Sequence, residues 1–214
     1  SLMGRRKPDA PLVEGGEDLG SVRGTFGTLL RTRDIWVIVG VGVIFFLSNH
    51  ALKNWLPRIL ELKGFNPEEA GYAASLMSLT GLIGNLTVPR LSYQVKSKRW
   101  TIALILLLSG ASISVIGFGD GGSLWTGIIL AGYSIRSIMP LLTLTLMEMP
   151  AIGSRKLGAA SGLLFSIGEI GGFLGPFMMG YLIDATGIYL SGILLLTAAN
   201  MMAILPLYFL EIKD

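Results

Sequence analysis

The fold class that this sequence predicts is an all-α membrane protein with six transmembrane helices. Six mostly apolar stretches follow one another along the chain, and about 20 such residues are needed for a helix to cross the hydrocarbon core of a bilayer. The stretches are residues 35–56, 70–91, 100–117, 124–147, 158–183 and 188–210. They lack the short alternating pattern of a membrane barrel, so helices are expected. The mean hydropathy of +0.64 agrees with this class.

The basic residues predict how these helices are oriented. Most of the 17 lysines and arginines fall before the first stretch and in the loops after the second and fourth stretches, whereas the loops around Asp120 and Asp184 contain none. Basic residues are favoured in short cytoplasmic loops. We therefore expect both termini in the cytoplasm and the chain in the plasma or inner membrane.

The composition excludes several functional classes. There is no cysteine and a single histidine, His50, so neither thiolate catalysis nor a Cys-rich or multi-His metal site is expected. An intramembrane serine protease would need a serine in a Gly-x-Ser-Gly type turn and a histidine on another helix, but His50 is alone and the chain lacks this serine motif. The pI near 9.3 is explained by the basic loops, so a nucleic-acid partner is not predicted. We expect no enzyme activity, no metal and no cofactor.

The chain is predicted to contain two parts. Residues 1–33 are polar, rich in glycine and charged, which is typical of a cytoplasmic linker. Residues 34–214 contain all six apolar stretches and are predicted to form a six-helix transmembrane bundle in contact with the lipid bilayer.

A repeat divides this bundle into two triplets. The second stretch contains Gly81, Gly84, Asn85 and Pro89, and the fifth contains Gly172, Gly175, Pro176 and Gly180 at the same spacing. Because three crossings separate the two patterns, they run in opposite directions through the membrane. The six helices are therefore predicted to form two inverted three-helix repeats.

The chain resembles the C-terminal six-helix half of a major facilitator superfamily transporter. The resemblance rests on GAASGLLFSIGEIGGFLGPFMMGYLIDATG at residues 158–187 and on LKNWLPRILELKGFNPEEAG at residues 52–71. It implies half of a twelve-helix fold, preceded in residues 1–33 by a segment like the central loop of the family. The basic loop of the family is poorly matched: Pro89 and Tyr93 replace its glycine and aspartate, and only Lys98 and Arg99 are kept.

The resemblance also implies a function and a missing partner. Members of this family are secondary transporters, symporters or antiporters, that move a small solute by alternating access, and ion or proton coupling is expected. Alternating access uses two six-helix units around a central site, so the partner is an N-terminal six-helix half or a second copy of this chain. A self-assembling half-transporter and a six-helix channel subunit remain the alternatives, although no filter loop is visible between the stretches.

Arg136 and Glu169 are the ionisable residues closest to the middle of any predicted span. A charge at the centre of a bilayer costs roughly 2.5 to 3.5 kcal/mol on insertion scales, so each needs a partner or a wet cavity. Three interpretations are open. The two residues form a buried ion pair, Arg136 anchors an anionic substrate, or Glu169 carries a coupling proton.

Prolines follow both charged positions. Pro140 cannot donate a hydrogen bond to the carbonyl of Arg136, and Pro176 cannot donate one to the carbonyl of Gly172. Kinks near the midplane occur where transporters bind substrates, but they also serve helix packing. Small residues such as Gly172 and Gly175 are expected to let neighbouring helices approach closely.

The remaining candidate residues are polar side chains within the stretches. His50, Lys53 and Asn54 lie near the outer end of the first stretch. They line the mouth of a cavity that attracts an anion, or they cap and anchor the helix end. Asn85 and Asn200 are expected to form hydrogen bonds between helices, with a place on the substrate pathway as the alternative for Asn85.

Overall fold

The computed structural model describes residues 27–95, 97–150 and 152–210. Within these ranges the chain forms six long helices and a short 3₁₀ helix, and residues 27–31 are also helical. The elements are α2 (Arg33–Leu62), α3 (Pro67–Ser92), α4 (Lys98–Phe118), α5 (Gly121–Glu148), α6 (Gly153–Thr186), α7 (Leu190–Met202) and η1 (Leu205–Phe209). Most of the predicted linker, residues 1–33, lies outside the described part of the chain.

Five helical segments are long and apolar enough to cross a membrane. They are α2, α4, α5, most of α6, and α7 continued by η1. The sixth helix, α3, has sufficient length at 26 residues, but its serines, threonines, glycines and Asn85 lower its hydropathy. Together these elements correspond to the six predicted spans.

The helix ends follow from local sequence signals. Asn66 caps α3 by accepting a hydrogen bond from the Glu69 backbone at 2.8 Å, and the Glu69 side chain accepts one from Asn66 in return, which forms a capping box. Gly187 ends α6 with φ of +74°, a conformation that favours glycine. The last predicted span is interrupted after Met202, because Pro206 cannot continue the α-helical hydrogen bonds.

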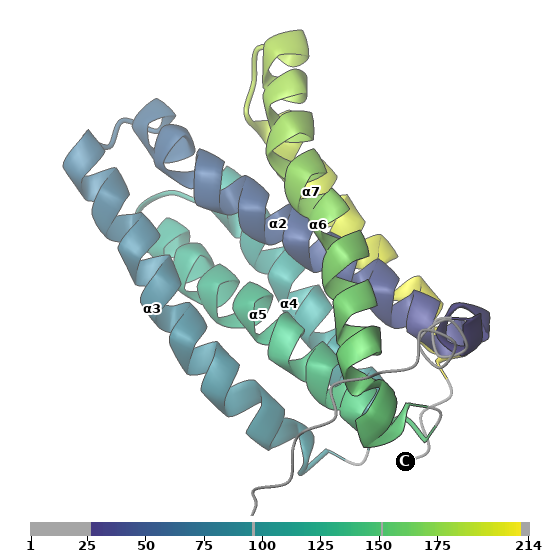
Figure 1. The fold of residues 1–214 in the computed structure, drawn as a ribbon. Coiled ribbons are helices and arrows are strands. Elements are labelled where there is room, and N and C mark those ends of the chain that lie inside the picture. The colour runs from purple at the N-terminus through teal and green to yellow at the C-terminus, as the bar shows by residue number, and fades with distance from the viewer. Residues whose placement is uncertain (1–26, 96, 151, 211–214) are drawn as a thin grey trace, which may run out of the picture.

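The helices pack as two interlocked triplets (Figure 1). The most extensive contacts join α2 to α6 and α3 to α5. Each of these contacts pairs the first helix of one triplet with the second helix of the other. Successive helices run in opposite directions, so the first triplet, α2 to α4, is inverted relative to the second, α5 to α7. The predicted inverted repeat is therefore the organising feature of the fold.

Both major helix crossings depend on glycine. A side chain at Gly175 of α6 would overlap the backbone carbonyl of Leu47 in α2. A side chain at Gly84 of α3 would overlap the backbone carbonyl of Tyr133 in α5 in the same way. In a membrane, such close backbone approach replaces the hydrophobic driving force that water would supply.

Asn200 of α7 ties three helices together in the core. Its Nδ2 donates to Ser48 Oγ of α2 at 2.8 Å, and its Oδ1 accepts from Ser109 Oγ of α4 at 3.0 Å. Asn200, Ser48 and Ser109 are fully buried. The interhelical hydrogen bonds predicted for Asn200 are confirmed.

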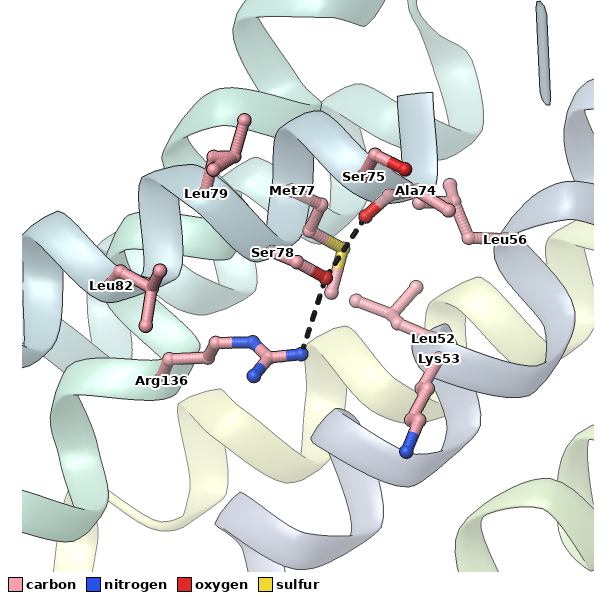
Figure 2. A pocket seen from close by; sticks show the side chains of 10 residues that line it. All are labelled: Leu52, Lys53, Leu56, Ala74, Ser75, Met77, Ser78, Leu79, Leu82 and Arg136. Atoms are coloured by element: carbon pink, nitrogen blue, oxygen red, sulfur yellow. Dashed lines mark hydrogen bonds between the residues drawn. The ribbon is translucent and has the colours of Figure 1, made fainter. Parts of the chain in front are cut away.

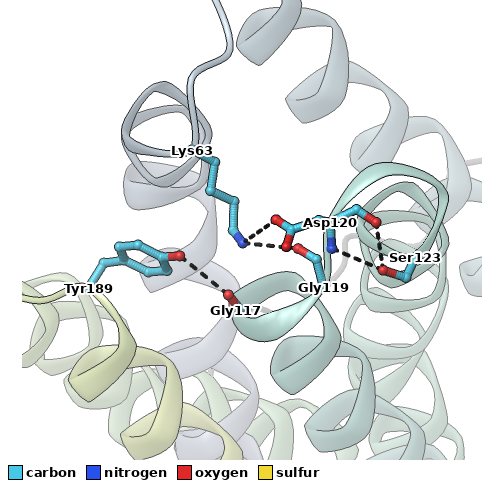
Figure 3. Close-up of polar contacts among 6 residues, drawn as sticks. All are labelled: Lys63, Gly117, Gly119, Asp120, Ser123 and Tyr189. Carbon is cyan, nitrogen blue, oxygen red and sulfur yellow. Dashed lines mark hydrogen bonds and ion pairs between the residues drawn. The ribbon is translucent and has the colours of Figure 1, made fainter.

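The two ends of the bundle carry different ionic contacts. We call one the Asp120 end, where the loops after α2, α4 and α6 meet (Figure 3). There Lys63 donates to the carbonyl of Gly119 at 3.0 Å and lies 3.6 Å from Asp120. The opposite end is called the Lys98 end, where Lys98 at the start of α4 pairs with Glu148 at the end of α5.

Candidate functional site

The middle of the α3/α5 crossing holds Arg136. Its guanidinium NH2 nitrogen reaches Ser78 Oγ of α3 at 3.5 Å (Figure 2). Gly81 lies beneath the side chain, because a Cβ at this position would overlap the Arg136 methylenes. The glycine thus leaves the space through which the arginine extends along α3.

The α2/α6 crossing holds a second polar pair. His50 Nε2 of α2 lies 4.0 Å from Glu169 Oε2 of α6. The Glu169 side chain is 53% exposed and that of His50 35%, so the pair opens onto a face of the bundle rather than into its core. Gly172 lies beneath both side chains, as Gly81 lies beneath Arg136.

These two pairs occupy equivalent positions of the inverted repeat. His50 and Arg136 are separated by the same number of residues as Leu47 and Tyr133, whose carbonyls lie against the glycines of the two crossings. Ser78 precedes Glu169 by the same number as Gly81 precedes Gly172. At each crossing, the repeat therefore places a nitrogen-bearing side chain from the first helix of one triplet opposite an oxygen-bearing side chain from the second helix of the other triplet.

Two pockets lie on either side of Arg136. The Lys53 pocket, of about 510 Å³, extends toward the Asp120 end and is lined by Lys53, Leu52, Ser75, Ser78 and Arg136 among others. In Figure 2, Arg136 enters it from α5, and Lys53 comes from α2 on the other side. The Asn85 pocket, of about 530 Å³, extends toward the Lys98 end. Arg136 is the residue that the two pockets share.

Unpaired polar atoms gather at the Asn85 pocket. Three buried side-chain atoms among the described residues lack a hydrogen-bond partner: Asn49 Oδ1, Asn85 Oδ1 and Arg136 Nε. All three residues line this pocket, together with Pro89 and Pro140. Buried polar groups are normally satisfied, so this concentration marks a place that suits a polar ligand.

The ion pair between Arg136 and Glu169, one of the three interpretations of these residues, is not formed. Glu169 faces His50, whereas Arg136 faces Ser78, and in the described part of the chain no salt bridge includes Arg136. The two residues have similar depth, but they belong to different helix crossings, and α5 contacts α6 much less than it contacts α3. The interpretation as a buried ion pair was therefore wrong.

The predicted cluster at the end of the first span is divided between different surroundings. Lys53 lines the Lys53 pocket, while His50 faces α6. Asn54 donates to the carbonyl of His50 at 2.8 Å within its own helix and lines neither pocket. Only Lys53 therefore shares a cavity with Arg136.

Pro140 and Pro176 have different surroundings in the fold. Pro140 lines the Asn85 pocket. The carbonyl of Pro176 accepts a hydrogen bond from Trp55 Nε1 at 3.1 Å, which joins α6 to α2. Pro140 thus borders a cavity, whereas Pro176 contributes to helix packing, as do Gly172 and Gly175.

Asn85 lines a pocket and leaves its Oδ1 unpaired, so that atom does not form the expected interhelical hydrogen bond. Ser78 and Asn49 belong to the site but were not predicted. The repeat contained a signal for Ser78, because it is the counterpart of Glu169. Nothing in the spacing distinguishes Asn49, whose role depends on how α2 is rotated.

The described residues contain no group of three His, Asp or Glu side chains that could hold a metal ion.

Comparison with known proteins identifies the family of this chain. A model of the Major Facilitator Superfamily matches residues 1–176. The uncharacterised transporter YycB of Bacillus subtilis is 32% identical over 184 residues, covering 79% of this chain and 44% of that protein. A 2-nitroimidazole transporter of Escherichia coli is 27% identical over 168 residues, covering 74% and 41%. The chain thus spans less than half the length of these relatives.

The fold itself matches a solved transporter. The crystal structure of the Escherichia coli fucose:proton symporter FucP superposes with a TM-score of 0.77 at 18% identity. The match covers 93% of this chain and 48% of FucP. At this identity the likeness concerns the fold, and it corresponds to about half of the larger protein.

Proposed function

The chain belongs to the major facilitator superfamily, and we propose that it is one six-helix half of a secondary transporter for a small organic anion. Its relatives are transporters and not enzymes, which agrees with the expected absence of enzyme activity. The proposal adds three elements to the family assignment: an anionic substrate bound at Arg136, proton coupling at Glu169, and alternating access with a second half.

The position of Arg136 is the observation that carries the anion proposal. Its side chain separates two pockets and lines both, and no Asp or Glu is among the residues that line either of them. A cation at this depth is costly unless a counter-charge or water compensates it. A carboxylate or phosphate can accept two parallel hydrogen bonds from the planar guanidinium, so a substrate anion would supply the missing partner.

Lys53 also supports an anionic substrate, because it adds a second positive charge to the proposed substrate route. It lines the pocket between Arg136 and the Asp120 end and is exposed. A second cation near the mouth of a cleft with low-dielectric walls raises the local concentration of anions. An anion would therefore meet Lys53 first and Arg136 second when it enters from the Asp120 end.

Glu169 and His50 support proton coupling. Carboxylate and imidazole groups within membrane segments commonly form proton relays, and these two lie 4.0 Å apart. Protonation of Glu169 would remove its charge and weaken its attraction to a protonated His50. The pair joins α2 to α6 at the position equivalent to Arg136 and Ser78. Because α2 also contacts α5, a movement of α2 against α6 would be transmitted to the α3/α5 crossing that holds Arg136.

A second six-helix unit completes the proposed transporter. Large apolar side chains on α3 and α6 are exposed, including Leu82, Leu86, Phe173 and Phe177, and Glu169 opens onto the same side of α6. Because the matched relatives are more than twice as long as their aligned region, an N-terminal half of the same polypeptide is favoured over a second copy. In this proposal both termini lie in the cytoplasm, at the Lys98 end, where the basic residues gather.

Uptake by the complete transporter in proteoliposomes tests the proposal. With a panel of radiolabelled small organic acids, including mandelate and phenylacetate, an inward proton gradient should accelerate saturable uptake. Glu169→Gln should keep exchange between internal and external acid but lose the acceleration. Glu61→Gln at the Asp120 end, which removes a carboxylate that pairs with Arg58, is the matched control.

Each failure would remove a different part of the proposal. Proton-driven acceleration that survives in Glu169→Gln would exclude Glu169 as the proton carrier. The absence of uptake for every acid would exclude the organic-anion assignment. Non-saturable currents through single molecules would favour the channel alternative.

A further inference from the structure

We propose that the Asn85 pocket binds the substrate as an organic acid that also carries an O–H or N–H donor next to an apolar body. This inference rests on the proposed function and specifies its substrate class. In this assignment the acid group binds Arg136, the donor binds the amide oxygens of Asn49 and Asn85, and the apolar body fills the rest of the pocket.

The unpaired atoms distinguish this pocket from the Lys53 pocket. The polar groups of the Lys53 pocket have partners or are accessible: Ser75 and Ser78 donate to carbonyls of their own helix at 3.0 and 3.1 Å. In the Asn85 pocket, Asn49 Oδ1, Asn85 Oδ1 and Arg136 Nε are buried without partners. Thr143, which also lines it, already donates to the carbonyl of Met139 at 3.0 Å.

The balance of donors and acceptors defines the ligand. Two of the unpaired atoms accept hydrogen bonds and one donates. Pro89 and Pro140 also line the pocket. Because proline has no backbone N–H, the carbonyls of Asn85 and Arg136, four residues earlier, lack their usual helical donors. The site therefore offers an excess of acceptors beside one cationic donor. A ligand that satisfies it needs an anionic acceptor and at least one donor.

A bare metal cation is a poor occupant, although carbonyl oxygens can hold sodium in transporters. Arg136 brings a fixed positive charge to the same pocket, and the lining contains no carboxylate to offset a second one. Neutral hydroxyl or amino hydrogens satisfy the same oxygens without this repulsion. The acceptors therefore favour a donor group that belongs to an anionic ligand.

The remaining walls of the pocket are apolar. Phe45, Met139, Leu144 and Met147 line it, and Phe45 is buried. Aromatic and thioether side chains pack well against an aliphatic or aromatic body. With a volume of about 530 Å³, the pocket lies within the range usual for small-molecule sites. A ligand of the size of a substituted phenylacetic acid is compatible with this shape.

Three matched probes test the inference on the complete transporter in detergent, with affinities measured by isothermal titration calorimetry. Mandelate carries the acid and a hydroxyl, phenylacetate lacks the hydroxyl, and mandelamide lacks the charge. Since a hydrogen bond contributes about 0.5–1.5 kcal/mol, we expect mandelate to bind about 2- to 12-fold more tightly than phenylacetate. Mandelamide should bind more weakly than either acid.

The variants assign these differences to residues. Asn49→Leu and Asn85→Leu should each bring the mandelate affinity close to the phenylacetate affinity measured in the same variant. Gln94→Leu removes an exposed amide from the loop after α3 and should keep the full preference. Two separate asparagine variants, each checked for a monodisperse profile in gel filtration, keep the test valid if one of them fails to fold.

The outcomes separate this inference from the proposed function. If both acids bind equally in the unmodified protein, or if the preference survives in both asparagine variants, the donor assignment is wrong while anion binding stands. If mandelamide binds as tightly as mandelate, the anionic function itself is contradicted. Failure of all three probes to bind the folded protein would overturn the assignment of this substrate class to the pocket.

Discussion

Replacing Gly175 with alanine should destabilise the bundle by opening the α2/α6 crossing. The added methyl group would overlap the backbone carbonyl of Leu47, and a backbone atom cannot rotate away as a side-chain end can. The helices must then separate by about 1 Å along one of the two most extensive interfaces of the fold, and a gap of this size forfeits roughly a quarter to a half of the van der Waals attraction of the affected contacts. Overpacking of this kind typically costs about 1–3 kcal/mol.

The same substitution at an open position provides the control. Gly162, also in α6, has no atom within 4 Å of the position that a Cβ would occupy, so Gly162→Ala should be neutral or stabilise the helix by up to about 1 kcal/mol. Unfolding of the transporter by SDS, followed by tryptophan fluorescence, compares the two variants. Equal stability of Gly175→Ala and Gly162→Ala would refute the close approach of α2 and α6.

Three further predictions concern other contacts of the structure. Asn200→Leu leaves the buried hydroxyls of Ser48 and Ser109 without their partner and should lower stability by about 1–3 kcal/mol in the same SDS titration; an unchanged midpoint would contradict the three-helix network. Lys63→Met removes a buried ammonium from the carbonyl it binds and should lower the free energy of unfolding by about 1–2 kcal/mol, with a change at the Asp120 end that hydrogen exchange would detect. Arg136→Lys keeps the charge but loses the planar fork, so mandelate affinity should fall about 10-fold while the preference over mandelamide remains; full retention of affinity would exclude paired hydrogen bonding.

The spans could be predicted from the sequence because membrane insertion depends on local hydropathy. The helices nevertheless extend beyond the predicted stretches. The first stretch was predicted to end at residue 56, but α2 continues to Leu62, through an amphipathic segment in which Arg58 and Glu61 lower the local hydropathy. The break after Met202 in the last span depends on Pro206, whose effect was not included in the prediction.

The pairing of charged residues could not be predicted in the same way. Residue position along a span gives the depth of Arg136 and Glu169, but the direction in which each side chain points depends on how the helices rotate and pack. Glycines at the two crossings determine that rotation, and they direct Arg136 toward α3 and Glu169 toward α2. Applying the repeat to polar residues as well as glycines would have matched Ser78 to Glu169 and predicted both pairs.

The most direct test of the account is the effect of Arg136→Gln on mandelate binding and uptake by the complete transporter. The guanidinium is proposed to supply charge-assisted hydrogen bonds, worth about 1.5–3 kcal/mol each, to the acid group. Its loss should reduce mandelate affinity by about 10-fold or more and abolish the preference for mandelate over mandelamide. Unchanged affinity and undiminished uptake in Arg136→Gln would show that the anion does not bind at this residue.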